Sequence, residues 1–230
     1  MAISCNICGS LDFQPFNVNP RENAQCANCG SLERHRALHY VLNSRGFLRP
    51  ELKGSRRCLQ LAPEKVTYDY ISQVFGSGYT TSDLTPEKYK HAKCLKLALP
   101  EGFQMIPDEY FYLILHNHVL EHIPGRFSSH VDQFYRILEY GGSMIFTIPD
   151  SYICKGIAKT VEGGEDLPSD EDRLKKFGQG DHYKWLGLDF VEYLRQKFSA
   201  VELLADRRNE DCQELIVNHN AFGIVFLCKK

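Results

Sequence analysis

Phe-Tyr-Leu-Ile-Leu-His, residues 111–116, contains the longest apolar run of the chain, from Phe111 to Leu115. A run this short cannot cross a membrane, which takes about 20 helical residues, and it is typical of a buried strand. A second apolar run, residues 143–148, ends at Pro149 and predicts another strand. Between the two runs, apolar residues keep helical spacing as far as Gly141-Gly142, and they are Phe127, Val131, Phe134, Tyr135 and Leu138. The segment therefore predicts a strand, a helix and a strand, the unit from which parallel sheets are built.

The same alternation continues on both sides of this unit. Upstream, a helix is predicted over 66–76, and short strands at 58–61, 78–83 and near 94–97. Downstream, a helix near 188–198 is followed by strand candidates at 200–204, 214–217 and 222–228. The absence of a helix among the last of these favours an antiparallel hairpin at the edge of the sheet. We therefore predict an α/β fold with a Rossmann-like, mostly parallel sheet and a terminal antiparallel hairpin.

Two Cys-x-x-Cys pairs open the chain, and 17 residues separate them. They are Cys5 and Cys8, then Cys26 and Cys29. A two-residue spacer lets both sulfurs of a pair reach the same tetrahedral zinc ion, and the gap is within the range of four-cysteine zinc sites. Two disulfides, or free thiols without metal, are the alternatives. Because so short a segment cannot form a stable core alone, we predict a structural zinc ribbon.

These signals divide the 230 residues into three parts. We expect a zinc ribbon over 1–30, a linking helix over 31–54 and one larger domain over 55–230. Within that domain, residues 151–184 are too long for an ordinary connection, and we predict that they form a cap over a pocket. Acidic residues spread among Gly, Pro and Ser between Glu162 and Arg173 predict a solvated loop there.

Composition narrows the choice of compartment and partner. A net charge of −2 carries no general attraction for nucleic acid or for an anionic membrane. The first residues, MAISCNICGS, contain no apolar stretch of the signal-peptide kind. Five cysteines stand singly outside the ribbon, which is typical of buried thiols in a reducing cytosol. We therefore expect a cytoplasmic protein without a membrane anchor, and the sequence predicts no oligomeric state.

Ligands of open parallel sheets bind beyond the carboxyl ends of the strands. Here those ends carry Ala62-Pro63-Glu64, Asp83-Leu84, Lys96-Leu97 and Asn117-His118. Asp83 follows Ala62 by 21 residues and ends the second strand of the sheet, where an acidic side chain is the usual partner of ribose hydroxyls. The spacing predicts a nucleoside-containing ligand at this edge.

Two segments resemble the class I S-adenosylmethionine-dependent methyltransferases. Residues 117–124, Asn-His-Val-Leu-Glu-His-Ile-Pro, look like the segment after the fourth strand in the small-molecule branch of that family. Residues 135–142, Tyr-Arg-Ile-Leu-Glu-Tyr-Gly-Gly, are similar to its entry into the fifth strand. A narrower resemblance is to bacterial methyltransferase-like proteins with a four-cysteine ribbon, through residues 31–36, 62–64 and 177–182. The resemblance implies a seven-stranded sheet and S-adenosylmethionine as the cofactor.

The resemblance also implies which residues bind the cofactor. We expect contacts from Ala62, Pro63, Glu64, Asp83, Leu84, Lys96, Leu97, Asn117 and His118. The first loop lacks the glycines of the wider family, so we add Arg34 and Arg36 of the basic helix as partners for the cofactor carboxylate. Glu64 would accept from its amino group. Lys96 stands where the family usually has an acid, and Tyr112 replaces an Asp early in the fourth strand.

Two histidines are candidates for the base of a methyl transfer. His182 follows Asp181 in the predicted cap, and we assign it the base role, with His118 as the second choice. A histidine on a surface loop is the other interpretation of His182. His118-x-x-Glu121-His122 also matches an inverted zinc-protease motif, but Pro124 follows too closely for both histidines to lie on one helix.

We therefore predict a methyltransferase that acts on a small-molecule or sugar-type acceptor. A ribosomal RNA methyltransferase is the enzyme alternative, although the ribbon has Arg21 as its only basic residue. A catalytically inactive fold that binds a partner is the third possibility.

Overall fold

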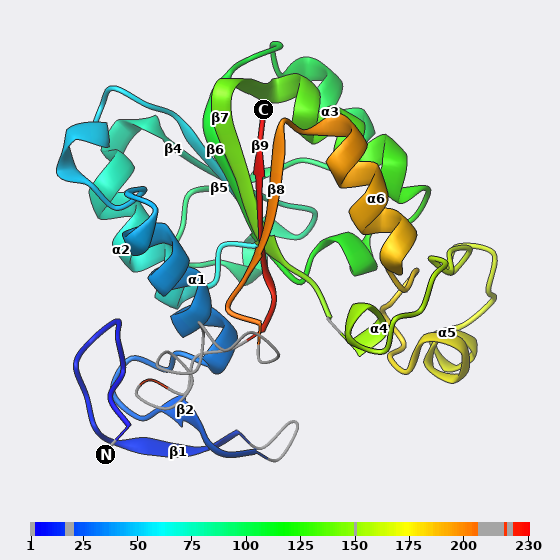
Figure 1. Ribbon diagram of the computed structural model, residues 1–230, viewed down its shortest axis with the longest axis horizontal. Helices are drawn as coiled ribbons and strands as arrows, with labels where there is room; N and C mark the ends of the chain where they lie inside the picture. Colours follow the sequence, from blue (N-terminus) through cyan, green and yellow to red (C-terminus); the bar gives the residue numbers. More distant parts are fainter. Residues whose placement is uncertain (1–2, 17–20, 150, 207–218, 220–222) are drawn as a thin grey trace.

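The computed structural model describes residues 3–16, 21–149, 151–206, 219 and 223–230 (Figure 1). Its larger sheet has seven strands in the order β5-β4-β3-β6-β7-β9-β8. They are β3 (Cys58–Leu61), β4 (Tyr79–Asp83), β5 (Cys94–Lys96), β6 (Phe111–Asn117), β7 (Leu138–Thr147), β8 (Ala200–Leu204) and β9 (Val225–Lys229). Strands β3 to β7 are parallel, and β9 runs antiparallel to both β7 and β8. The predicted fold class is confirmed; the strand candidate at 214–217 lies outside the described residues.

Helices cover both faces of this sheet (Figure 1). On one face lie α1 (Glu33–Ser44) and α2 (Lys65–Phe75), and on the other α3 (Phe127–Ile137) and α6 (Leu188–Lys197). Successive residues of a strand point to opposite faces, so Leu113 and Leu115 of β6 pack with α1 and α2, whereas Ile114 packs with α3 and α6. This two-sided burial explains why the central strands are continuous apolar runs rather than alternating ones.

The remaining elements are short. A separate antiparallel hairpin consists of β1 (Phe13–Phe16) and β2 (Arg21–Cys26). The connection after β7 contains α4 (Ser151–Cys154) and α5 (Asp170–Phe177). The 3₁₀ turns are η1 (Pro50–Leu52), η2 (Gly76–Gly78), η3 (Pro86–Lys88), η4 (Glu101–Met105) and η5 (Leu120–His122). In Figure 1 the hairpin and the α4–α5 segment flank the edge at which β7 ends.

Strand β7 begins five residues earlier than its apolar run predicts. It starts at Leu138, directly after α3, and its pairing with β6 shifts register between Phe111 and Leu113. Gly142 lies in this irregular part, where a Cβ atom would sit 2.8 Å from the carbonyl oxygens of Tyr112 and Glu139. Only glycine fits so close a backbone approach. Gly141-Gly142 therefore belongs to the strand rather than ending the helix.

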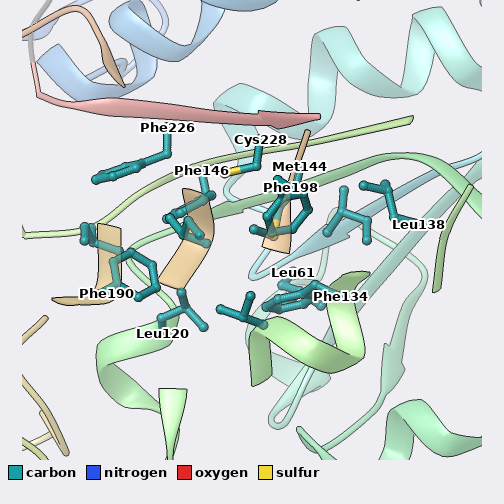
Figure 2. Close-up of a cluster of buried hydrophobic side chains, with 14 of the residues drawn as sticks. Leu61, Leu120, Phe134, Leu138, Met144, Phe146, Phe190, Phe198, Phe226 and Cys228 are labelled. Carbon is teal, nitrogen blue, oxygen red and sulfur yellow. The ribbon is translucent and has the colours of Figure 1, made fainter. Parts of the chain in front are cut away.

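A largely aromatic cluster fills the space between the sheet and the helices α3 and α6. Figure 2 shows Phe134 and Phe190 from these helices together with Phe146 and Phe226 from the sheet. Phe146 stacks on Phe226 with ring centroids 4.8 Å apart. His116 of β6 also lies between aromatic rings, 5.3 Å from that of Phe134 and 4.6 Å from that of Phe146. Burial, and then His118 and His130, lower the pKa of His116 to about 3.

Acidification is expected to destabilise the protein through His116. Its folded pKa lies below the unfolded value of about 6.5, so the unfolded chain takes up the proton first. The stabilisation is complete above about pH 6.5 and is lost as the pH falls toward 3, by about 1.4 kcal/mol per pH unit. The His116→Phe variant should show a flatter loss of unfolding free energy than wild type between pH 6.5 and 4.5. Urea unfolding across that range measures it, with His91→Phe in the β4–β5 connection as the control. Equal slopes for His116→Phe and wild type would contradict the assignment.

The single cysteines outside the ribbon occupy several environments. Cys58 and Cys228 are buried in the core, as predicted. Cys94 is only half-buried and Cys154 is exposed, so the prediction of buried thiols is wrong for these two. Cys212 lies outside the described residues. Within the part of the chain that the structure describes, no helix has the length and apolar character of a membrane span.

Candidate functional site

The four predicted zinc ligands meet beside the β1–β2 hairpin. The sulfurs of Cys5, Cys8, Cys26 and Cys29 lie within 4.8 Å of one another, and all four cysteines are free. Cys5 Sγ is 3.7 Å from Cys29 Sγ, and Cys8 Sγ is 3.6 Å from Cys26 Sγ. These separations are far longer than a disulfide bond of about 2.0 Å. They match the roughly 3.8 Å between two thiolates on a tetrahedral zinc ion, so the cluster fits that metal.

Arg36 connects the hairpin to α1 and does not reach the sheet edge. Its fully buried guanidinium donates to three backbone carbonyl oxygens, those of Ala24, Ser31 and His219. Asn6 Nδ2 donates to the Arg36 carbonyl oxygen. One turn earlier on α1, Glu33 accepts two hydrogen bonds from Arg21 of β2. Arg36 therefore holds the ribbon on the helix, and we leave it out of the proposed cofactor site.

Arg34 lies against the loop that follows β3. Its Nη2 is 2.5 Å from Glu64 Oε1, and His35 Nε2 is 2.7 Å from Glu64 Oε2. His35 Nδ1 accepts from the backbone N–H of Leu32, which leaves Nε2 as the donor to Glu64. Burial raises the pKa of Glu64, but His35 and Arg34 outweigh it and lower the pKa to about 2. The Arg34 Nε–H is buried without a hydrogen-bond partner among the described residues, so a donor remains for an anionic group.

Asp83 ends β4 at the same edge of the sheet. Its Oδ1 accepts hydrogen bonds from the backbone N–H and the hydroxyl of Thr85, at 2.7 and 3.0 Å. Among the residues that the structure describes, its Oδ2 accepts only from the Tyr89 hydroxyl, at 3.2 Å. A carboxylate oxygen can accept more than one hydrogen bond, so Oδ2 retains capacity for ribose hydroxyls.

The loop after β3 and the end of β6 lie side by side, because Leu61 pairs with His116. Ala62 and His118, which follow these strands, both have left-handed backbones, with φ of 47° and 50°. Non-glycine residues in this region store backbone strain, and such strain gathers at functional sites. Asn117, which directly precedes His118, is buried, and its Oδ1 accepts from the Thr147 hydroxyl. The chain thus makes sharp turns at the two neighbouring strand ends where ligands of parallel sheets bind.

The other predicted cofactor contacts lie along the same edge but make fewer specific interactions. Pro63 contributes its carbonyl oxygen, which is 2.7 Å from His91 Nε2. Leu84 and Lys96 are exposed, and Leu97 is half-buried against the core.

A cluster of His118, Glu121, His122 and His182 lies where η5 meets the connection after β7. The Glu121 carbonyl oxygen accepts from the backbone N–H of Tyr183, which ties this connection to η5. Burial and then His122 lower the pKa of His182, while Glu121 and Asp181 oppose them, so burial favours the neutral ring. Residues 120–122 form a single 3₁₀ turn rather than an α-helix, so the protease motif lacks the geometry that its chemistry needs.

The connection over 151–184 is docked on the protein through its acidic residues. Glu162 accepts from the backbone N–H of Phe127, the first residue of α3, and Glu165 from that of Gly125, two residues before the helix. Lys184 is fully buried and donates to the Gly125 carbonyl oxygen. Burial lowers the pKa of Lys184 to about 8 despite nearby glutamates. The predicted solvated loop between Glu162 and Arg173 is irregular and partly exposed as far as Ser169, although Glu162 and Glu165 bind backbone N–H groups, and the prediction is wrong for 170–173, which begin α5.

Sequence reasoning missed three residues of these sites. His35 was hidden in a charge run, and Lys184 had no motif around it. Glu121 was considered only within the protease motif, where its partners are His118 and His122 rather than His182. No sequence pattern could have brought Glu121 and His182 together, because that requires knowing that η5 contacts residue 183.

Comparisons with known proteins agree with the fold. No protein-family model matches the chain, and no curated protein matches its sequence. Among solved structures, the chain is similar to an S-adenosylmethionine-dependent methyltransferase from Archaeoglobus fulgidus, with a TM-score of 0.54, 15% identity and coverage of 85% of this chain and 94% of that one. A second such enzyme, from Mesorhizobium loti, has a TM-score of 0.51, 13% identity and coverage of 84% and 96%. The CurJ carbon methyltransferase is similar at a TM-score of 0.51 and 13% identity, over 85% of this chain and 53% of that one.

With its strand order, its strained turns after β3 and β6 and these structural neighbours, the chain has the fold of the class I S-adenosylmethionine-dependent methyltransferases. The expected resemblance and the seven-stranded sheet are confirmed at the level of the fold.

Proposed function

We propose that this protein is an S-adenosylmethionine-dependent methyltransferase that acts on a small-molecule or sugar-type acceptor in the cytoplasm. The observation that carries the proposal is the meeting of three groups at the carboxyl edge of β3, β4 and β6. They are the Arg34–Glu64 pair, the Asp83 carboxylate and the turn at His118. Each of these three groups suits a different part of S-adenosylmethionine, which is a nucleoside that carries an amino acid.

The side chains divide the cofactor between them. Arg34, whose Nε–H has no hydrogen-bond partner among the described residues, would bind the carboxylate of the methionine part, and Glu64 its ammonium group. Asp83 would accept from the ribose hydroxyls. Leu84, Lys96, Leu97 and Asn117 would surround the base, with Ala62 and Pro63 contributing backbone. The cofactor supplies an electrophilic methyl group on a sulfonium.

The protein's own contribution to the reaction is alignment and proton removal. In-line displacement depends mainly on holding donor and nucleophile in line. A neutral histidine takes the proton that a hydroxyl or amine acceptor loses, which aids the transfer at neutral pH. We assign this role to His182, with His118 as the second candidate, since both lie in the cluster beside the end of β6. The segment 151–184 would shield the reaction from water.

The ribbon is a structural element in this proposal and not a nucleic-acid-binding surface. Its single arginine, Arg21, is paired with Glu33, and Arg36 is buried. RNA recognition of the ribbon type needs free cations and stacking aromatics. These contacts disfavour the ribosomal RNA alternative.

Replacing Asp83 with asparagine is expected to weaken cofactor binding about tenfold. A hydrogen bond to a charged group is worth about 1.5–3 kcal/mol, and about 1.4 kcal/mol corresponds to a factor of ten. Asparagine keeps an acceptor for the Thr85 N–H, so the turn should survive. Isothermal titration with S-adenosylhomocysteine measures the affinity.

Asp69→Asn is the matched control for this experiment. Asp69 lies on α2 and, within the described part of the chain, forms an ion pair only with the exposed Lys65, so its loss should leave the affinity unchanged. Equal affinities of the two folded variants would exclude the proposed ribose site. No heat of binding for wild type would favour an inactive fold that binds a partner.

A further inference from the structure

Glu121 is a buried carboxylate without a partner that neutralises it fully. Its side chain is 2% exposed, and neither of its oxygens makes a hydrogen bond within the described part of the chain. A buried carboxylate is costly unless it is paired or coordinates a metal. The nearest cationic candidates are His118 Nδ1 at 3.2 Å and His122 Nε2 at 3.9 Å, both from Oε1. The side chains closest to Glu121 are therefore imidazoles, which are also metal ligands, and the buried Lys184 acts on it only through its charge.

His122 is oriented so that one ring nitrogen is free to bind a metal. Its Nδ1 is 3.0 Å from the carbonyl oxygen of Asp181 and donates to it. The proton on Nδ1 leaves the lone pair on Nε2, the atom that faces Glu121. Metal-binding histidines usually donate their other N–H to a carbonyl or carboxylate in this way.

His182 completes a set of three from the other side. It is 3% exposed, and its Nδ1 has no hydrogen-bond partner among the residues that the structure describes. Its ring stands at 82° to that of His122, with centroids 4.8 Å apart. One ligand atom from each of Glu121, His122 and His182 lies within 4.8 Å of the other two. Ligands about 2.1 Å from a tetrahedral ion are about 3.4 Å apart, so small side-chain shifts close the site.

We propose that Glu121, His122 and His182 bind a divalent transition-metal ion of the zinc class, separate from the ribbon. Two imidazoles and one carboxylate favour such an ion over magnesium or calcium, which prefer oxygen ligands. Three protein ligands leave a coordination position open, as in catalytic rather than structural zinc sites. The Tyr183 N–H bonded to the Glu121 carbonyl oxygen holds the two segments together before the ion binds.

The test of this site is independent of methyl transfer, because binding is measured on the metal itself. It does change how the histidines share the reaction. While the ion is bound, the Nδ1 lone pair of His182 is occupied, and His118, whose side chain is 36% exposed, is the free base. The alternative without metal is a cluster in which protonated His118 or His122 pairs with Glu121.

The test counts zinc in the full-length protein. The protein is equilibrated with Zn²⁺ in the presence of millimolar Mg²⁺ and freed of excess metal. Its zinc content is then measured by inductively coupled plasma mass spectrometry. Wild type should hold one zinc more per chain than Glu121→Gln and than His182→Ala, whatever the ribbon holds. His39→Ala, a half-buried histidine on α1 across the sheet, is the matched control and should retain the wild-type content.

Each outcome decides the proposal. Circular dichroism establishes that each variant is folded, and Glu121→Gln keeps the shape of the side chain if His182→Ala does not fold. Equal zinc contents in wild type and folded Glu121→Gln would overturn the site. Displacement of the extra zinc by Mg²⁺ would overturn the class of ion. A loss of zinc in His39→Ala as well would show that the variants lose metal without regard to this site, which also overturns it.

Discussion

Replacing His182 with alanine is expected to lower kcat by about two to four orders of magnitude while cofactor affinity stays nearly unchanged. This is the usual contribution of a positioned general base, and an interaction made only in the transition state affects kcat rather than binding. The buried, unpartnered Nδ1 has no structural hydrogen bond to lose in the described residues. The rate of S-adenosylhomocysteine formation with an acceptor that wild type methylates measures kcat, and titration measures affinity.

His39→Ala controls for the removal of a histidine ring elsewhere and should keep the wild-type rate. A folded His182→Ala variant with a kcat within a factor of about three of wild type would remove His182 from the reaction. The zinc content of the same preparation distinguishes the two roles of His182, as a base and as a metal ligand. A fall in kcat with the zinc retained indicates a base, and a fall with one zinc lost indicates a ligand.

Removal of the ribbon zinc is expected to unfold residues 3–30 while the seven-stranded sheet persists. A structural zinc ion contributes about 10–16 kcal/mol to the folding of small metal domains. The hairpin has little core of its own apart from Ala24 and the ligands Cys5 and Cys26. The Cys29→Ser variant should therefore hold one zinc fewer per chain and be cut by trypsin after Arg21, while far-ultraviolet circular dichroism changes little.

Cys154→Ser is the matched control, because Cys154 is an exposed cysteine outside the ribbon. It should keep both zinc and protease resistance. Wild-type protein with less than about half a zinc per chain would count against the ribbon site, as would a Cys29→Ser variant that stays resistant to trypsin. Loss of helical signal in Cys29→Ser would instead show that α1 depends on the ribbon through Arg36.

Periodicity and spacing were sufficient for the elements of the sheet. The apolar runs that became β3, β6 and β9 are local patterns, and a strand buried on both faces needs such a run wherever it lies in the chain. The two Cys-x-x-Cys pairs were equally informative, because a zinc ion imposes its own geometry on whichever backbone carries the ligands. The register at Gly142 was not accessible, since it depends on the approach of Tyr112 from a neighbouring strand.

The basic helix shows where local reasoning fails. Arg34 and Arg36 are two residues apart, so they project from different sides of α1. The sequence does not say which side meets the sheet edge and which meets the hairpin, and both arginines were assigned to the cofactor. In the structure, Arg34 lies on Glu64 and Arg36 lies under the ribbon.

The amino-acid sequence by itself determined the alternation of strands and helices, the four-cysteine cluster and the position of Asp83 at a strand end. Each of these depends on residues close together in the chain or on a ligand with fixed geometry. Only the tertiary structure decided that His122 and His182, separated by 60 positions, face the same buried carboxylate. Their meeting depends on how the segment after β7 docks on η5, and that docking is a sum of weak contacts among distant residues that no local pattern records.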